Sequence, residues 1–576
     1  MKECYANFKG ARALVVLALA LAAALATVSI AEGTEALSEY DAFSVDGITY
    51  EVENVEMKHV YIDYYQGNPT HIFGTVSYDG SIWTVDSMIS NAFLNCNSLV
   101  SVDLPGASNV TYSAFQGCSN LKEVNLPKAG YIGDYAFQGC NALTHIKFSE
   151  SLLNVGDEAF SVSFYSEGKS LAADAGSLLG KEFVGSGDGD LHEGFAADSP
   201  DGGGKILYGV TDYASHSVGI VGFEGGPAQI SGTVSHGGSD WTVVSVGDNA
   251  LKGCTCMKFV DLPEAVSIGN GAFSGCPSLR NVRFSSSLAI VGTDAFQMEF
   301  RSEGDAIASD ADHLRGKEFV DYGGLLHEGF IVASPDGEGD ILLKIRAAKP
   351  KYVDIVGFEG NPSQVSGTVS YGGSSWTIMS VSNDAFYGCQ SLETADLPNA
   401  TELGINAFNG CTSLKEINIP HTTYISDDTF NGCTSLRYMD LQSVVDLNEN
   451  AFYDCLALSH IRFSDKLDNV GMDVFSVDFY SEGELLAADA GSLRGRTFTG
   501  SGDGDLYESF AISWLDDAGA LADTTFARKG ETPSHDSLTK EPTDRYTYEF
   551  AGWSPEPVPA SGEESYTAVF DAAVRT

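Results

Sequence analysis

Apolar residues recur along this chain at fixed positions of a short period. In one copy, residues 121–126 read Leu-Lys-Glu-Val-Asn-Leu and precede Pro127, the pattern of a short strand that ends at a proline. Residues 132–137 then place Ile, Ala and Phe where an opposite wall would need them. The phrase at 114–127 returns almost unchanged at 407–420. The pattern predicts a coil with a strand on one side, a wall on the other and a core between them.

A cysteine marks each copy of this coil. Within three groups the cysteines follow one another at intervals of 22 residues: Cys96, Cys118 and Cys140; Cys254 and Cys276; Cys389, Cys411, Cys433 and Cys455. A fixed period in this range predicts coils that stack on copies of themselves. About five buried apolar side chains, worth about 1.5–3 kcal/mol each, roughly offset the ordering of one coil. Stability must therefore come from contacts between coils.

The cysteines of such a column are poorly placed for disulfides. Stacked coils lie roughly 4.8 Å apart with equivalent side chains parallel, so neighbouring Cβ atoms are slightly too distant and their bonds do not converge. Single stacked cysteines also lack the close pairs that a tetrahedral zinc site uses. We therefore expect buried thiols that act as small core residues. Only the pair Cys254 and Cys256 departs from the spacing.

Longer repeats enclose the cysteine coils. A Gly-Thr-Val-Ser phrase followed by a Trp precedes each group and predicts a β-hairpin over the open end of the coils, at 74–85, 232–243 and 367–378. A second conserved-length segment, which contains a Ser-Glu-Gly phrase, follows each group. These ends divide the chain into three modules and a tail, with expected ranges 45–197, 198–333, 334–511 and 512–571.

The phrase Ile-Gly-Asp-Tyr-Ala-Phe-Gln-Gly-Cys-Asn-Ala-Leu at 132–143 resembles the BspA-type (treponemal class) leucine-rich repeat of bacterial, archaeal and protozoan surface proteins. Two copies depart from the motif, with Leu251 in place of Phe and Thr429 in place of Ala. The resemblance implies a β-rich repeat solenoid, with 22-residue leucine-rich repeats in three blocks, β-hairpin caps and a small β-rich tail domain.

The tail carries a different pattern. Its Phe-Ala-Gly-Trp phrase at 550–553 and its Tyr-Thr-Ala-Val-Phe phrase at 566–570 resemble the Listeria-Bacteroides repeat, a small β-rich module similar to the internalin B-repeat. In proteins of this kind, such modules usually sit between a binding domain and a cell envelope.

The first 31 residues have the features of a signal peptide. Lys2, Lys9 and Arg12 precede an apolar run at 13–30, which ends in small residues at Ala31. We expect residues 1–31 to be removed and the folded part to be secreted or held at the cell surface. An uncleaved N-terminal anchor is the alternative, because the apolar run has the length of a short membrane helix.

The charge of the chain excludes nucleic acid as a partner. Its 32 Lys and Arg stand against 79 Asp and Glu, for a net charge of -47, and a phosphate backbone requires a basic face. Acidity of this kind keeps a long, exposed protein soluble.

Catalytic motifs are absent from the sequence, so we expect no enzyme and no cofactor. His192 and His327 each precede a Glu in a Leu-His-Glu-Gly-Phe phrase, but the third copy has Tyr507 at this position, which favours a structural role in a cap. The Gly-Asp-Gly-Asp phrases at 187–190 and 502–505 raise calcium as an alternative to tight acidic turns. They lack the spacing of an EF-hand loop.

The strand faces are the remaining candidates for a site. Side chains on either side of the buried central residue of each strand point outward. The candidate ligand-facing residues are Glu123, Asn125, His145, Lys147, Asp261, Arg283, Asp396, Glu416, Asn418, Tyr438, Asp440, His460 and Arg462. Acidic and amide residues come first, and Lys147, Arg283 and Arg462 fall on the last coil of their group. A solvated face, with its last coil adapted to a cap, is the alternative interpretation.

These features predict an exported adhesion or recognition protein that binds an extracellular protein, a cell surface or a glycan through its repeat faces. The alternative is a structural component of a cell envelope or surface coat. Two N-glycosylation sequons, at 109–111 and 399–401, are of the sort that coat proteins carry.

Overall fold

The structure is a computed structural model that describes residues 37–500 and 504–575. It divides into two compact units. The described residues up to Phe300, with Ala306–Glu318, form unit 1, and Arg301–Asp305 with the described residues from Phe319 onward form unit 2. The predicted signal peptide at 1–31 lies outside the described residues. Within those residues, no helix combines the length and apolar character needed to cross a bilayer.

Unit 1 contains the first stack of coils, around Cys96, Cys118 and Cys140. Its longer strands form a parallel column: β4 (His71–Phe73), β7 (Ser101–Asp103), β9 (Glu123–Asn125) and β11 (His145–Lys147). Its short strands form a second parallel column: β8 (Asn109–Val110), β10 (Tyr131–Ile132) and β12 (Asn154–Val155). The strands pair with the register that the 22-residue period predicts.

Unit 1 also contains the second stack, around Cys254 and Cys276. Its long-strand column is β19 (Gln229–Ile230), β22 (Phe259–Leu262) and β24 (Asn281–Phe284). Its short-strand column is β21 (Ser239–Val246), β23 (Ser267–Ile268) and β25 (Ile290–Val291). The two stacks are continuous, because the long-strand column of the first and the short-strand column of the second belong to one sheet of fourteen strands.

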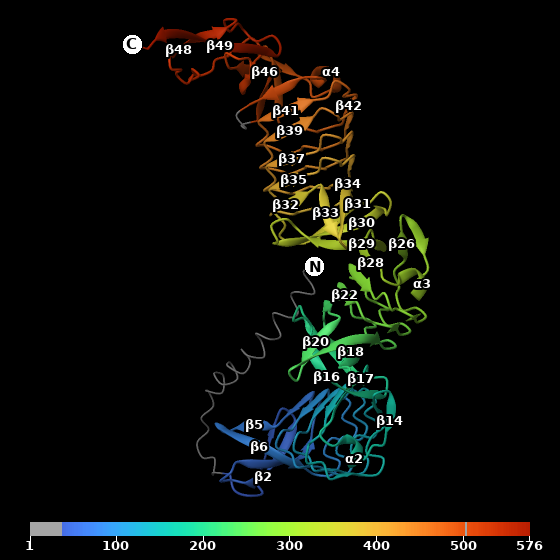
Figure 1. Cartoon of the computed structure of the whole chain (residues 1–576). Coiled ribbons are helices and arrows are strands. Elements are labelled where there is room, and N and C mark those ends of the chain that lie inside the picture. Colours follow the sequence, from blue (N-terminus) through green and yellow to red (C-terminus); the bar gives the residue numbers. More distant parts are fainter. Residues whose placement is uncertain (1–36, 501–503, 576) are drawn as a thin grey trace. The chain divides into compact units, whose positions relative to one another are not determined.

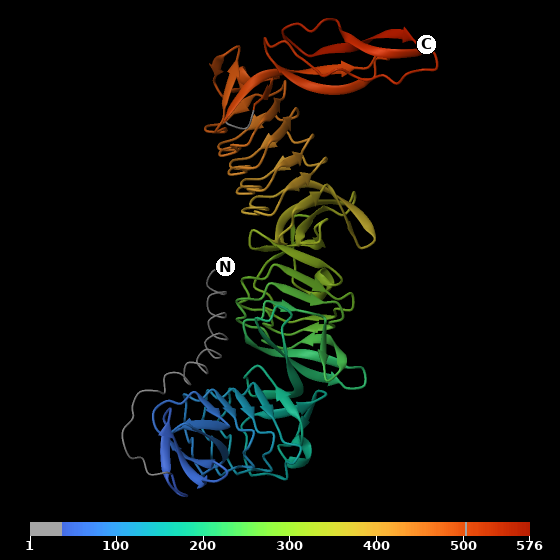
Figure 2. The same ribbon diagram turned by 90° about the vertical axis from the view of Figure 1, so that its left-hand side faces the viewer.

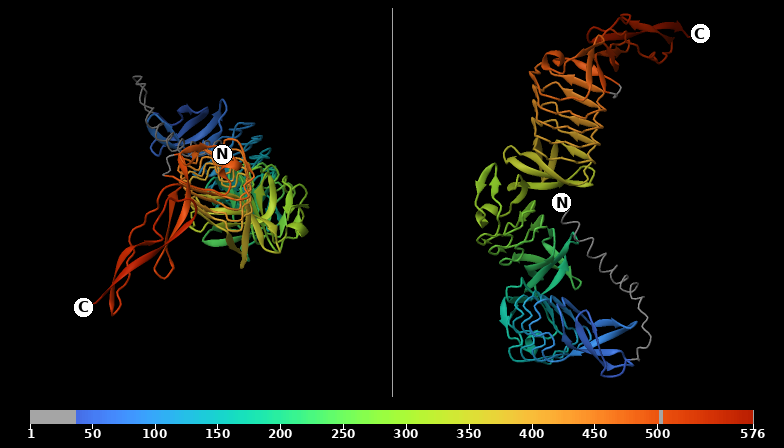
Figure 3. Two further views of the ribbon diagram at one scale, coloured as in Figure 1. Left: turned by 90° about the horizontal axis from the view of Figure 1, so that it is seen from above. Right: turned by 180° about the vertical axis from the view of Figure 1, so that it is seen from behind.

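Unit 2 contains the third stack, around the four cysteines from Cys389 to Cys455 (Figure 1). Its long-strand column is β32 (Gln364–Ser366), β35 (Thr394–Asp396), β37 (Glu416–Asn418), β39 (Tyr438–Leu441) and β41 (His460–Phe463). Its short-strand column is β34 (Ser374–Val381), β36 (Glu402–Leu403), β38 (Tyr424–Ile425), β40 (Asp446–Leu447) and β42 (Asn469–Val470). Figure 2 shows these rungs in orange from the side, and Figure 3 shows them from above, where successive coils overlie one another. The predicted β-rich repeat solenoid is confirmed.

A ladder of stacked phenylalanines fills the core of the first and third stacks. In the first stack the rings of Phe93, Phe115, Phe137 and Phe160 follow one another with centroids 5.2–5.5 Å apart. In the third, the rings of Phe386, Phe408, Phe430, Phe452 and Phe475 are 5.1–5.5 Å apart. Spacing slightly above the distance between rungs lets each ring contact the next one directly. The cohesion therefore runs between coils, as the sequence predicts.

The cysteines of the 22-residue columns are free and buried, which confirms the prediction of thiols in the core. They do more than fill space. From the second coil of each stack onward, the thiol donates to a backbone carbonyl of the preceding coil, as Cys118 does to Phe93 at 3.1 Å and Cys433 does to Phe408 at 3.2 Å. Each thiol is therefore also a polar link between adjacent coils.

The predicted hairpins begin the stacks. β5 (Thr75–Tyr78) pairs with β6 (Ser81–Met88), β20 (Thr233–His236) with β21, and β33 (Thr368–Tyr371) with β34. In the second and third stacks, the second strand of the hairpin is also the first rung of the short-strand column, since β21 pairs in parallel with β23 and β34 with β36. The hairpins are therefore continuous with the solenoid.

An antiparallel strand ends the long-strand column of the first stack. β15 (Glu182–Val184) pairs with β11 and with β16 (Asp190–Asp198). Beside them lie β13 (Ser163–Ser166), β14 (Lys169–Leu171) and the short helix α2 (Ala175–Leu178). Strand β16 then pairs with β17 (Gly204–Asp212), which is followed by β18 (Ser217–Gly225), so one strand belongs to the end of one stack and to the start of the next.

The third stack ends in the same way. β45 (Thr497–Thr499) pairs with β41 and β46 (Asp505–Leu515), beside β43 (Asp478–Ser481), β44 (Glu484–Leu486) and α4 (Ala490–Leu493). Strand β46 continues into the tail sheet with β47 (Leu521–Arg528), β48 (Tyr546–Ser554) and β49 (Glu564–Val574). The expected boundary at 511/512 falls inside this strand, and the module ranges stay predictions.

The segment that ends the second stack has the same order of elements as the ends of the first and third stacks. The segment after the second stack comprises β26 (Phe300–Ser302), β27 (Asp305–Ile307), α3 (Ala311–Leu314), β28 (Glu318–Tyr322) and β29 (Leu325–Ala333). In unit 2, β29 pairs with β30 (Gly339–Ala347), β30 with β31 (Tyr352–Gly360), and β31 with β34. At the start of unit 1, β1 (Ala42–Val45), β2 (Ile48–Asn54) and β3 (His59–Tyr65) lead into β6.

Candidate functional site

The outward face of the long-strand column in the third stack carries two lines of candidate residues. The central residues of β35, β37, β39 and β41 are buried, and their neighbours point outward as predicted. The first line is Thr394, Glu416, Tyr438 and His460, and the second is Asp396, Asn418, Asp440 and Arg462. The repeat therefore places residues far apart in sequence in two straight rows.

An open groove of about 730 Å³ lies over three of these rungs. Among its lining residues are Thr394, Asp396, Glu416, Asn418, Tyr438 and Asp440. This volume is within the range of small-ligand sites in proteins. The groove brings together five of the thirteen candidate residues, whereas His460 and Arg462 lie on the next rung. That these residues bind a ligand stays a prediction.

Neighbouring side chains hold two of the three carboxylates in the groove. Asn418 Nδ2 donates to Asp396 Oδ1 at 2.7 Å, and Gln442 Nε2 donates to Asp440 Oδ2 at 2.8 Å. Neither of these two donors carries a positive charge, and the register partner of Asp440 on the next rung is Arg462. In the part of the chain that the structure describes, no donor pairs with the exposed carboxylate of Glu416.

Tyr438 lines one end of the groove and stacks on His460 of the next rung. The rings of Tyr438 and His460 stack with centroids 4.6 Å apart and an angle of 18° between their planes. The rings of Phe526, on β47 of the tail, and His460 pack in a T-shaped arrangement with centroids 4.6 Å apart. Burial lowers the pKa of His460, with opposing effects of nearby charges, so its imidazole is mainly neutral at pH 7. Burial, followed by the charge of Asp440, raises the pKa of Tyr438.

On the corresponding face of the first stack, the basic residues of the last coil are paired with a carboxylate of the cap. Glu182, on the terminating strand β15, contacts His145 Nε2 at 2.9 Å and Lys147 Nζ at 3.5 Å. Burial alone would raise the pKa of Glu182, but these two bases outweigh it and the net shift is downward. In addition, Asn125 Nδ2 donates to Asp103 at 2.8 Å. For this stack, the basic last coil is matched to its cap, which supports the alternative interpretation of His145 and Lys147.

The face of the second stack is also paired internally. Arg283 forms a bidentate ion pair with Asp261, in which Nε donates to Oδ1 at 2.6 Å and Nη2 donates to Oδ2 at 2.7 Å. In the third stack, Thr497 pairs with Arg462 in the register in which Glu182 pairs with Lys147. The carboxylate that compensates the basic coil of the first stack is therefore replaced by a hydroxyl here. Among the described residues, the cap of the third stack therefore places no carboxylate opposite Arg462.

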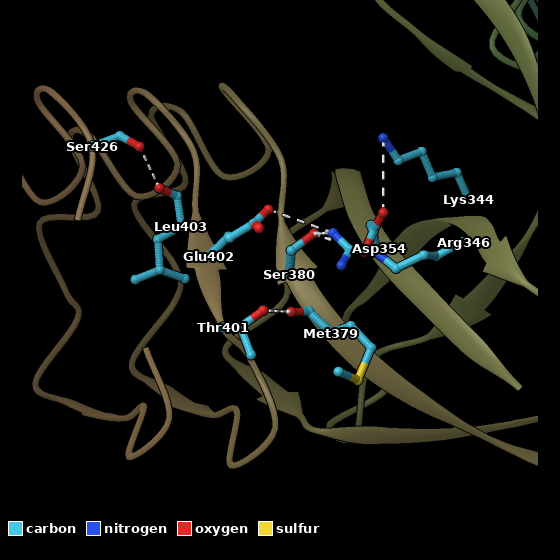
Figure 4. A network of polar contacts seen from close by, with 9 residues as sticks. All are labelled: Lys344, Arg346, Asp354, Met379, Ser380, Thr401, Glu402, Leu403 and Ser426. Carbon is cyan, nitrogen blue, oxygen red and sulfur yellow. Dashed lines mark hydrogen bonds and ion pairs between the residues drawn. The ribbon is translucent and has the colours of Figure 1, made fainter. Parts of the chain in front are cut away.

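A buried carboxylate at the start of the third stack escaped the sequence analysis. Asp354, on β31, is 4% exposed; Arg346 Nε lies 2.8 Å from its Oδ1, and Ser380 Oγ donates to the same atom at 2.7 Å. Lys344 Nζ lies 3.8 Å from Oδ2, and Arg346 also reaches Glu402 of β36 at 3.6 Å (Figure 4). The network ties the strands of the initial sheet to the first short strands of the stack.

The repeated Leu-His-Glu-Gly-Phe phrase lies in the strands that end the stacks. Glu193 is buried, with Lys181 Nζ at 2.8 Å, and it accepts a hydrogen bond from Tyr213 Oη at 2.6 Å. His192 stacks on Tyr165. The third copy keeps the buried carboxylate as Glu508, with Arg496 at 3.2 Å. In both copies the buried glutamate pairs with a basic residue of the cap, Lys181 or Arg496. The phrase therefore has a structural explanation.

The acidic turns hold no evident cation site in the described residues. Asp190 N donates to Asp188 Oδ1 at 3.2 Å, so this carboxylate closes its own turn. Residues 502 and 503 of the second phrase lie outside the described residues. No group of three or more potential metal ligands occurs in the described ranges 37–500 and 504–575.

The repeats match the family model for the BspA type leucine rich repeat region, in six copies over residues 83–167, 240–304 and 374–479. The three stacks therefore carry BspA-type leucine-rich repeats. No curated protein matches the chain. The match does not include the tail, whose resemblance to the Listeria-Bacteroides repeat stays a prediction.

Several solved structures are similar to the chain. A leucine-rich repeat protein from Bacteroides ovatus is 20% identical, with 75% of this chain and 91% of that one covered and a TM-score of 0.21. A leucine rich cell surface protein from Faecalibacterium prausnitzii is 18% identical, with 77% and 93% covered and a TM-score of 0.23. The pneumococcal vaccine antigen PcpA is 13% identical, with 77% and 92% covered and a TM-score of 0.18.

Proposed function

We propose that this chain is a secreted or cell-surface recognition protein that binds a protein, cell-surface or glycan ligand through the groove of the third stack. The observation that carries the proposal is the open groove of about 730 Å³ over three rungs of the third face. On the first and second faces, the basic residues of the last coil are paired with carboxylates of the chain, Glu182 and Asp261. The third face leaves Glu416 without a partner in the described chain, beside an open groove.

The architecture supports a binding role on physical grounds. Each added rung contributes two outward positions without a change in the core, so the face can be varied while the stack stays stable. The backbone of these rungs is fixed by ladder hydrogen bonds and by the phenylalanine column. A ligand therefore meets side chains on a rigid support, which reduces the entropy that is lost on binding.

The proposed location follows from the predicted signal peptide at 1–31. An extracellular position would give the groove access to other cells and to matrix or glycan ligands. The tail, if it is a Listeria-Bacteroides module, would serve as a spacer between the binding stacks and a cell envelope.

Binding selections with the full chain test this function. Peptide-display libraries and glycan arrays are probed with the wild-type chain and with the variant E416A/Y438A/D440A, and the affinity of each selected ligand is then measured. We expect the variant to bind at least about tenfold more weakly, since it loses charge and ring contacts at the centre of the groove. The matched control is E123A/N125A on the first stack, which should bind as the wild type does. Equal affinities of the wild type and the groove variant would exclude this face as the binding surface.

A further inference from the structure

The groove of the third stack is strongly acidic. Asp396, Glu416 and Asp440 line it, and its lining residues, all in the described chain, include no lysine or arginine. The nearby Lys415 is held by Glu393 at 2.7 Å. Removing three carboxylates from water without a counter-charge is unfavourable. An occupant of this groove must therefore bring positive charge.

The ring of Tyr438 offers a second recognition element. Glu416, Tyr438 and His460 are direct partners on successive rungs. Because the Tyr438 and His460 rings stack at 4.6 Å, close to the distance between rungs, their faces are turned along the stack. His460 covers one face of Tyr438. The opposite face is turned toward the rung of Glu416, where the side chain is flexible and carries a carboxylate.

These two elements are complementary to one chemical group. A guanidinium stacks on a tyrosine face and, at the same time, forms paired hydrogen bonds with a carboxylate. We infer that the groove binds an extended, arginine-containing segment of a partner protein, with a guanidinium between the free face of Tyr438 and the carboxylate of Glu416. This inference rests on the proposed function, and it names the class of ligand for that groove.

The other carboxylates fit the same ligand. Asp396 and Asp440 lie in the second line, on rungs β35 and β39, so they flank the level of Glu416. Alternate side chains of an extended segment are about 7 Å apart. A second basic side chain can therefore reach this line while the first is at Tyr438. Asn418 and Gln442 orient these two carboxylates by hydrogen bonds.

Fluorescence anisotropy with the full chain tests the inference. The probe is a labelled synthetic peptide of alternating glycine and arginine, compared with the same peptide in which citrulline, a neutral isostere, replaces arginine. We expect binding of the arginine peptide only, with an affinity that falls as sodium chloride is added. E416Q and Y438L should each weaken binding about tenfold. E123Q, on the equivalent strand of the first stack, should leave it unchanged.

The outcomes separate this inference from the proposed function. Equal binding of the arginine and citrulline peptides, or equal effects of E416Q and E123Q, would overturn the inference. A second outcome is that neither peptide binds, whereas a glycan from the array binds the wild type but not E416Q or Y438L. In that case the inference of an arginine-containing ligand is wrong, and the groove remains the binding surface. If no peptide or glycan distinguishes the groove variants from the wild type, both proposals fail. Circular dichroism and thermal melting check that each variant is folded.

Discussion

At the scale of single residues, the cysteines of the columns act as hydrogen-bond donors between coils as well as small core residues. A buried backbone carbonyl needs a donor. In the first and third stacks the carbonyl of a ladder phenylalanine accepts both the amide of its own coil and the thiol of the next, as Phe93 does from Cys96 N at 3.0 Å and from Cys118 Sγ at 3.1 Å. In the second stack the same carbonyl is that of Leu251. A serine would be more polar in this dry core, and an alanine would lose the donor. Cysteine fits both requirements.

The thiols should be protected from reagents in the folded chain. Burial raises the pKa of Cys276 to about 11 and that of Cys254 to about 12, so little thiolate forms at pH 8. We expect iodoacetamide to leave the buried columns unmodified at pH 8 and to modify them when guanidinium chloride unfolds the chain, as followed by peptide mass spectrometry. The partly exposed Cys256 is the internal control and should react first. Labelling of all sites at one rate in the native protein would contradict the buried columns.

The sequence predicts residues well where the period encodes them. Apolar positions such as Phe137, and outward positions such as Glu416, follow from the repeat and from strand alternation. The contact between His460 and Phe526 could not be predicted, because it depends on how the tail strand β47 passes the last rung. The contact between Glu182 and Lys147 could not be predicted either. The repeat period does not determine how the irregular cap strand pairs with the last coil.

At the scale of elements, the ends of the stacks depend on strands that two sheets share. β16 and β46 each close one column and continue into the next sheet. Such strands carry a buried carboxylate, Glu193 or Glu508, that accepts hydrogen bonds or ion pairs from the surrounding cap. The repeated Leu-His-Glu-Gly-Phe phrase in the sequence predicts a structural role in a cap. Its buried charge follows only from the packing.

Substitution of Glu193 should make the stability of the first cap depend less on pH. Burial would raise the pKa of Glu193, but hydrogen bonds from Lys181, Ser166 and Tyr213 outweigh it, and the net pKa is lowered. Its stabilising effect is therefore complete above the unfolded value of 4.5 and is lost as the pH falls through the folded pKa. We expect E193Q to lower the free energy of unfolding by about 1–3 kcal/mol at pH 7.

Guanidinium chloride unfolding at several pH values measures this effect. The difference between the wild type and E193Q should shrink as the pH is lowered toward about pH 3. E56Q, at an exposed carboxylate, is the control and should show a small difference at every pH. A difference for E193Q that stays constant across the pH range would show that the charge of Glu193 contributes nothing.

The Asp354 network should be important for the start of the third stack. In D354A, Arg346 and Lys344 lose their buried partner, and we expect a loss of about 3 kcal/mol in the free energy of unfolding. The control is E402Q, because Glu402 is 68% exposed and lies 3.6 Å from Arg346; its loss should be below about 1 kcal/mol. Hydrogen exchange of peptides from 344–381 localises the effect. Equal protection in both variants would contradict this role of Asp354.

At the scale of the whole molecule, the chain varies the number of coils while it keeps the same kinds of ends. Three cysteine coils occur in the first stack, two in the second and four in the third. Hairpins begin each stack, and in the first and third an antiparallel strand closes the long-strand column. Since each coil contacts only its neighbours, stability is close to a sum over coils and their interfaces. The longest stack is also the one that carries the groove, which lies over β35, β37 and β39.

Deletion of one whole coil should therefore preserve the solenoid. Removal of residues 390–411 takes out one period after Cys389, so β32 can pair with β37, and the phenylalanine and cysteine columns stay in register. We expect a native far-ultraviolet circular dichroism spectrum and a melting temperature lowered by about 5 °C. Removal of residues 390–400 deletes half a period and brings strand sequence where the wall should be, so the third stack should lose its protection from hydrogen exchange. If the two deletions damaged the stack equally, the stability of this protein would not rest on interchangeable coils.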